Sequence, residues 1–489
     1  MGTRGSRSAQ YRGLAPSLRE SGLRECEGRV RREDPPARVP RSEPKASEAE
    51  MGTQVWPEAG LPADARRIVV ARAVRGLADG CVSVLLPAHL LAIGLDAFAV
   101  GLVATATLLG SALATLAVGF GAARLPTRGV LLAGSVLMAA TGVGFASITA
   151  LAPLLVVAFV GTLNPSSGDV SFFLPVEHAL LARLVPESRR TSTFARYATA
   201  GALAGALGAL AAGLPDLLAE LGIASRATTL RAGFGLYGLA ALALAALYQG
   251  LRLPPDTRSP IPDPTSEPRP VQRAASGARS AGEARAESAG QAERSGGLRE
   301  SRGRVLGLAA LFSIDAFGGG LVVQSLLALF LFRRFGLSLG DASLLFFATG
   351  LGSALSQLAA PALARRIGLV RTMVLPHLVA NACLAAVPFA TSLPLALALL
   401  GLRSLLSTLD VPARSAYVMS IVTPPERPAA ASVTSVPRSL ASAAAPVLAG
   451  WLLARATFGW PLLLAGLLKG GYDLLLLAAF GRVRPRDEV

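Results

Sequence analysis

The sequence has little of the side-chain chemistry on which metalloproteins and most enzymes depend. Only three of its 489 residues are cysteine and only three are histidine. Cys26, Cys81 and Cys383 stand far apart, so they form neither a CxxC metal site nor a disulfide framework. The motifs GxxxxGK[ST], HExxH and GxSxG are also absent, which argues against ATP as the energy source and against an intramembrane hydrolase. We therefore expect no cofactor, no metal and no enzymatic activity.

Charged residues are scarce as well. They make up 16% of the chain, against about 25% in ordinary soluble proteins. Hydrophobic residues make up 52%, and they come in runs of about 18 to 25 residues, the length that spans the hydrocarbon of a bilayer. The sequence therefore predicts an all-α membrane protein whose main partner is the lipid bilayer.

The net charge of +16 does not indicate a nucleic-acid-binding protein. Most of the arginines lie before residue 66, within residues 252–304 and at the ends of the apolar runs. Arginines at such places set the orientation of membrane spans, whereas a nucleic-acid site needs them gathered on one surface. We expect no nucleic-acid partner.

The apolar runs predict twelve transmembrane helices in two groups of six. The domain boundaries that follow are a disordered cytoplasmic tail (1–65), an N-terminal six-helix bundle (66–251), a disordered cytoplasmic linker rich in Pro, Ser, Arg, Glu and Gly (252–304), a C-terminal six-helix bundle (305–481) and a short cytoplasmic tail (482–489). The expected spans are 68–93, 97–120, 129–149, 151–182, 192–213, 231–250, 305–332, 341–364, 372–390, 393–420, 430–453 and 458–480.

The arginine distribution predicts the orientation. Short loops with arginine follow the even-numbered spans, whereas the turns near Leu95, Leu151 and Ser392 have none; Arg333, Arg334 and Arg455 oppose the trend. We expect both termini in the cytoplasm and the chain in the inner (plasma) membrane.

Twelve spans in two sixes around a hydrophilic linker resemble the major facilitator superfamily (MFS), over residues 66–481. The loop after the second span, Gly119-Phe-Gly-Ala-Ala-Arg-Leu-Pro-Thr-Arg128, is a degenerate form of that family's motif, with Ala123 in place of its aspartate. The glycines of the fifth span (Gly201, Gly205, Gly208, Gly213) are similar to those of drug/proton antiporters. The alternative for these glycines is close helix packing in lipid. The resemblance implies the MFS fold and gradient-driven transport.

Ionisable residues inside the spans are candidate sites, because a charge in hydrocarbon is costly. They fall in the first, fourth, seventh and tenth spans, the helices that line the central cavity in the resembled family. Asp169 follows Asn164-Pro-Ser-Ser-Gly168, a stretch that should interrupt the fourth helix. The candidates for proton coupling or substrate contact are Asp79, Asp169, Glu177, Asp315, Asp410 and Arg414.

Interhelical pairing is the alternative role for these residues. The four-residue spacing predicts the pairs Arg75–Asp79, Asp410–Arg414 and Lys469–Asp473. A second group lies at loops and helix ends and could form gate or loop salt bridges: Arg124, Arg128, Glu187, Arg196, Arg365, Arg366, Glu426 and Arg438. Arg196 could instead anchor its span at the interface.

These features predict a secondary active transporter that works as a monomer by alternating access. Proton-coupled efflux of a small organic or amphipathic compound is the first hypothesis. Import of a metabolite or organic anion is the second, since Arg403 and Arg414 could bind a carboxylate or phosphate. A receptor or scaffold that acts through residues 252–304 without transport is the alternative from another class.

Overall fold

The structure is a computed structural model that describes residues 61–121, 126–166, 171–252, 301–423 and 426–480. Within these ranges every regular element is a helix. The tails 1–60 and 481–489 and most of the predicted linker lie outside the described residues.

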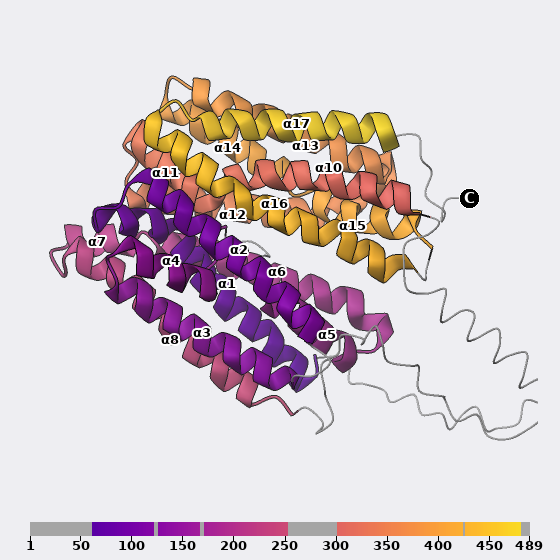
Figure 1. The fold of residues 1–489 in the computed structure, drawn as a ribbon, viewed down its shortest axis with the longest axis horizontal. Helices are drawn as coiled ribbons and strands as arrows, with labels where there is room; N and C mark the ends of the chain where they lie inside the picture. The colour runs from indigo at the N-terminus through magenta and orange to yellow at the C-terminus, as the bar shows by residue number, and fades with distance from the viewer. Residues whose placement is uncertain (1–60, 122–125, 167–170, 253–300, 424–425, 481–489) are drawn as a thin grey trace, which may run out of the picture. The chain divides into compact units, whose positions relative to one another are not determined.

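The first half of the chain forms the helices drawn from indigo to magenta in Figure 1. Long apolar runs favour helices here, since a helix satisfies its own backbone hydrogen bonds in lipid. Their bounds are α1 Ala63–Ala92, α2 Ala97–Gly121, α3 Thr127–Ser147, α4 Leu151–Val160, α5 Phe173–Leu184, α6 Glu187–Ala211, α7 Leu214–Glu220 and α8 Arg226–Gln249.

The second half forms the helices drawn from orange to yellow (Figure 1). Their bounds are α10 Arg302–Leu321, α11 Gln324–Phe335, α12 Leu339–Ile367, α13 Leu369–Ala386, the short 3₁₀ helix η1 Val387–Phe389, α14 Leu393–Leu406, α15 Asp410–Ile421, α16 Arg427–Arg455 and α17 Trp460–Phe480. Three predicted spans are each divided in two, as α4 and α5, α10 and α11, and α14 and α15.

Ten stretches of the described chain are long and apolar enough to cross a membrane. The predicted first and fourth spans are outside this set for different reasons. The 30-residue α1 carries Arg66, Arg67, Arg72, Arg75 and Asp79, and the fourth span consists of the short helices α4 and α5. Together these two elements complete the twelve expected crossings.

The two halves repeat one pattern of helix packing. In the first half α1 packs on α6 and α3 on α8; in the second half α10 packs on α16 and α13 on α17. Between the halves, α2 packs on α16 and α6 packs on α12. The same partners at the same places in each half support the duplication that six plus six spans suggests.

Glycines permit the closest of these helix contacts. A Cβ atom on Gly80 of α1 would collide with the carbonyl of Gly205 on α6, and one on Gly101 of α2 would lie 2.7 Å from the Cα of Gly450 on α16. Three fifth-span glycines, Gly201, Gly205 and Gly208, pack directly against α1, as the packing alternative predicted.

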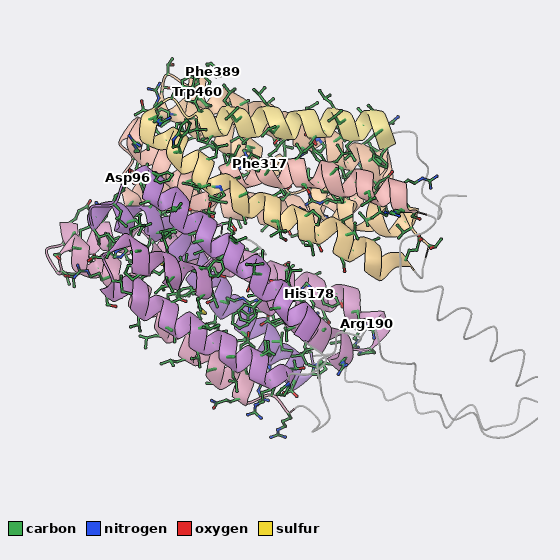
Figure 2. The ribbon with its side chains drawn as sticks, in the orientation of Figure 1. Asp96, His178, Arg190, Phe317, Phe389 and Trp460 are labelled. Carbon is green, nitrogen blue, oxygen red and sulfur yellow. The ribbon has the colours of Figure 1, made fainter. Side chains whose placement is uncertain are left out.

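Turns and helix ends gather at two opposite ends of the molecule. Figure 2 shows Asp96, Phe389 and Trp460 at one end, here named the Asp96 end, and Arg190 at the other, the Arg190 end. At the start of α12, Asp216 Oδ2 from the first half accepts hydrogen bonds from the backbone N–H groups of Leu339 (2.9 Å) and Gly340 (3.4 Å). This carboxylate therefore joins the halves and complements the α12 N-terminus.

Candidate functional site

A buried cluster around Glu177 joins four helices of the first half. Arg75 Nη2 on α1 lies 2.7 Å from Glu177 Oε2 on α5. The hydroxyls of Tyr197 on α6 and Tyr248 on α8 donate to Glu177 at 2.5 and 2.6 Å, and Arg75 in turn donates to both hydroxyls. All four side chains are at most 2% exposed, so Glu177 has its charge and both its oxygens satisfied away from water.

Asp79 lies one turn beyond Arg75 on α1. It is 4% exposed, and its Oδ1 has no hydrogen-bond partner among the described residues. The predicted Arg75–Asp79 salt bridge was wrong, because Arg75 bonds to Glu177 instead. Spacing along one helix could not reveal that α5 would place a carboxylate closer.

The second half holds a larger buried cluster around Asp315 on α10. Asp315 Oδ1 lies 2.5 Å from Lys469 Nζ on α17, and its Oδ2 lies 3.1 Å from Arg414 Nη1 on α15. The same Arg414 nitrogen lies 3.4 Å from Asp410 Oδ2, which confirms that four-residue pair. Two cations and two carboxylates, contributed by α10, α15 and α17, therefore form one ion-pair network.

His377 on α13 extends this cluster to a third carboxylate. Its Nδ1 lies 2.8 Å from Asp473 Oδ1, and its Nε2 lies 3.8 Å from Asp315 Oδ1. Asn381, one turn further on, donates to Asp473 Oδ2 at 2.8 Å. The predicted Lys469–Asp473 pair was wrong, because Lys469 bonds to Asp315 and Asp473 bonds to His377 and Asn381.

A cavity of about 400 Å³ lies between the two halves of the helix bundle. It is lined from the first half chiefly by α6 and from the second half chiefly by α12 and α14. Arg72 and Arg403 line it, together with hydroxyl and amide side chains that include Ser353, Thr408 and Gln357. Neither Glu177 nor Asp315 is among the lining residues. The structure thus separates a cavity for a solute from two sealed ionic clusters.

The family model of the Major Facilitator Superfamily matches residues 68–281 and 308–489. The chain belongs to this superfamily. The match covers both predicted bundles, so the chain is a multi-pass membrane transporter with the MFS fold. Facilitators are transporters and not enzymes, in agreement with the prediction from the missing catalytic motifs.

Individual relatives agree with this assignment. The uncharacterized membrane protein YJR124C of Saccharomyces cerevisiae is 26% identical over 429 residues, which are 83% of this chain and 92% of the yeast protein. A D-xylose-proton symporter has a similar fold, with a TM-score of 0.64 at 14% identity over 84% of this chain and 97% of the symporter. A bacterial homolog of the lysosomal transporter Spinster, inward-facing and occupied, has a TM-score of 0.61 at 14% identity over 86% and 97%.

Within this facilitator, the predicted gate residues lie at helix ends and surfaces. Arg128 is exposed and donates to the carbonyl of Gln249 at 2.5 Å. Arg196 on α6, Arg365 and Arg366 at the end of α12 and Arg438 on α16 are exposed, and none forms a salt bridge with a described residue. Glu426 is buried just before α16. Arg124, Asp169 and the side chain of Glu187 lie outside the described residues.

Several residues of the facilitator's clusters were not among the sequence candidates. Tyr197, Tyr248 and Asn381 are uncharged, so the search for ionisable residues passed over them. His377 has no ionisable neighbour at helical spacing in the sequence, since its partners come from distant helices. The Lys469-x-x-x-Asp473 spacing did signal polar residues in the last span, but it assigned the wrong partners.

Proposed function

We propose that this chain is a proton-coupled secondary transporter that moves a small organic solute by alternating access. The cluster around Asp315 and His377 is the observation that carries the proposal. It places a histidine, the side chain most suited to exchanging a proton near neutral pH, between two buried carboxylates.

Charge accounting supports a proton in this cluster. Three buried carboxylates (Asp315, Asp410, Asp473) face two buried permanent cations (Lys469, Arg414). With His377 neutral these groups carry one net negative charge, and one bound proton cancels it. Arg438 on α16 lies within electrostatic reach of Asp315 and Asp410, but its side chain is exposed. Binding and release of a proton would therefore change the net charge of a buried cluster. Because a net charge in low dielectric is costly, this change would strongly favour one conformation over another.

The contacts between the halves support alternating access. They include helix packing of α2 on α16, α6 on α12 and α1 on α11, and hydrogen bonds such as those from Leu339 and Gly340 to Asp216. Noncovalent contacts of this kind can be exchanged for others as one bundle rocks against the other. We place the Arg190 end in the cytoplasm and the chain in the inner (plasma) membrane, because the short arginine-containing loops lie at that end.

Export is the direction that we propose, by antiport against protons. Its support is the similarity of the fifth-span glycines to those of drug/proton antiporters. Import is the alternative, supported by the arginines of the cavity. Resistance and uptake profiling of a deletion strain separates the two, since loss of an exporter sensitises the cell whereas loss of an importer abolishes uptake.

The coupling test compares two buried histidines in proteoliposomes. The solutes are those found by profiling, and the readouts are accumulation driven by a pH gradient and solute exchange without a gradient. We expect His377→Gln to lower accumulation by at least about tenfold, the size of typical site-to-site coupling, while exchange continues. His89→Gln is the matched control, because His89 is equally buried and, among the described residues, its ring hydrogen-bonds to the Phe145 carbonyl and to no carboxylate. Undiminished accumulation in His377→Gln would contradict the proposal.

A further inference from the structure

The cavity between the halves has an unusual balance of charge. Two of its lining residues, Arg72 from α1 and Arg403 from α14, are cations. The described residues that line it include no aspartate and no glutamate. Glu177 and Asp315 belong to the two clusters, where cations and hydrogen bonds already satisfy them, and Asp79 does not line the cavity.

Arg403 carries the argument. Its guanidinium forms no salt bridge with any described residue, and its Nε is buried without a hydrogen-bond partner. A guanidinium in the membrane interior is costly unless an anion or polar groups satisfy it. Arg414, the other arginine that the sequence suggested for binding an anion, differs in this respect, because Asp315 and Asp410 neutralise it. The structure therefore leaves Arg403 as the cation available to a solute.

Arg72 brings a second cation to the same cavity from the other half. Its guanidinium lies over the ring of Tyr197, 5.6 Å from the ring centroid, and packs against Gly201 on α6. Arg72 already has interactions within its own half, so it holds its position before a solute arrives. A solute that bonds to Arg403 and also approaches Arg72 would touch both halves, which is what a solute must do to favour one arrangement of the halves over another.

The serine, threonine and glutamine side chains among the lining residues indicate a solute with polar groups. Thr408 Oγ1 donates to the carbonyl of Ser353 (3.0 Å), Ser404 Oγ donates to the carbonyl of Gly401 (2.7 Å), and Gln357 adds an amide. Because these hydroxyl protons are already used, the hydroxyl oxygens can accept hydrogen bonds from a solute. A volume of about 400 Å³ falls at the small end of ligand pockets, which run from about 300 to 1,000 Å³.

We propose that the cavity binds a small hydroxylated organic anion, whose oxyanion group, a carboxylate or a phosphate, pairs with Arg403. The planar guanidinium donates two parallel hydrogen bonds to either group. The solute's own hydroxyls donate to the lining oxygens. This inference names the substrate class of the proposed function and rests on it.

The test measures binding to the purified full-length chain in detergent, with probes that differ in one group. Glucose, gluconate, glucose 6-phosphate, inorganic phosphate and the cation tetraphenylphosphonium are titrated while thermal unfolding is followed. We expect gluconate or glucose 6-phosphate to raise the unfolding temperature and glucose and tetraphenylphosphonium to leave it unchanged. Gluconate alone would identify a carboxylate solute, and glucose 6-phosphate alone a phosphate ester.

Variants assign the effect to Arg403. Arg403→Gln should raise the half-maximal concentration of the anion at least about tenfold, the loss expected for one charge-assisted pair, and Arg403→Lys should restore part of it. Arg334→Ala is the matched control, because Arg334 is exposed and does not line the cavity. Stabilisation by inorganic phosphate that survives in Arg403→Gln would show an adventitious ion only.

Two results would overturn the inference: no Arg403-dependent stabilisation by any of the anions, or equal stabilisation by glucose. Because the measurement involves no proton gradient, its outcome is independent of coupling. Anion binding without pH-driven accumulation would reject the proposed function and keep the anion site. Accumulation of cationic or uncharged solutes alone would reject the anion site and keep coupled transport.

Discussion

The two halves of this transporter bury ionic clusters of different composition. In the first half one carboxylate, Glu177, meets one cation, Arg75, and two tyrosine hydroxyls. In the second half three carboxylates meet two permanent cations and His377. The first cluster is balanced in charge whatever the pH near neutrality. Under the proton coupling that we propose, the second is balanced only when it holds a proton.

This difference suggests a division of labour between halves that share one packing pattern. A balanced cluster that joins α1, α5, α6 and α8 holds the first bundle together as a rigid body. A cluster with an excess carboxylate can exchange a proton with its surroundings and so respond to a gradient. Alternating access requires bundles that move as rigid bodies about a central cavity and a site that responds to the proton gradient.

The largest expected effect comes from the balanced cluster. Glu177→Gln keeps the size of the side chain but removes the anion that pairs with buried Arg75, and the tyrosines supply hydrogen bonds and no charge. We expect a loss of about 3–5 kcal/mol in the free energy of unfolding, as for other broken buried pairs. Unfolding of the purified protein in detergent measures it.

The control for this variant is Glu220→Gln on α7, an exposed carboxylate in the same half. It should change stability by less than about 0.5 kcal/mol. If Glu177→Gln changes the free energy of unfolding as little as Glu220→Gln does, then the first cluster does not stabilise its bundle. The contrast between the halves would then disappear.

Two buried tyrosines give a smaller effect that sharpens the contrast. Tyr248 donates a 2.6 Å hydrogen bond to Glu177. The hydroxyl of the equally buried Tyr472 on α17 has no hydrogen-bond partner in the part of the chain that the structure describes. Tyr248→Phe should therefore cost about 1.5–3 kcal/mol, the range for hydrogen bonds to charged groups. Tyr472→Phe should be neutral or stabilising, because it removes an unsatisfied polar atom. Equal losses in the two variants would contradict this picture.

The sequence predicted the architecture because run length and charge scarcity depend only on local composition. The break in the fourth span was also predictable, since Asn164-Pro-Ser-Ser-Gly168 cannot continue a helix in lipid without protein or water beside it, and α4 ends at Val160. The break after Leu321 follows the glycines Gly318-Gly-Gly320, which are weak helix formers but which the run-length criterion does not take into account. The break after Leu406 has no comparable sequence signal.

The site could be predicted as a set of residues but not as a set of pairs. Glu177 and Asp315 were candidates because they are ionisable residues inside predicted spans. Their partners, however, depend on which helices pack together. The spacing rule for one helix succeeded for Asp410 and Arg414 and failed for Arg75 and Lys469, where another helix offered a closer carboxylate. The cavity was harder still, because serine and threonine in a span carry no sign of whether they face lipid, protein or solute.

The smallest expected effect on stability tests the excess of carboxylates directly. Asp473→Asn removes one negative charge from the second cluster, and its remaining carbonyl oxygen can still accept from Asn381 or His377. We expect a cost of about 1 kcal/mol, well below that of Glu177→Gln, since the surviving groups Asp315, Asp410, Lys469 and Arg414 balance without a proton. The same variant should lose accumulation driven by a pH gradient, because the neutral cluster no longer gains by binding one. If Asp473→Asn destabilises the protein as much as Glu177→Gln does, then both clusters serve mainly to hold their bundles together. If Asp473→Asn leaves accumulation undiminished, then the coupling proton binds elsewhere.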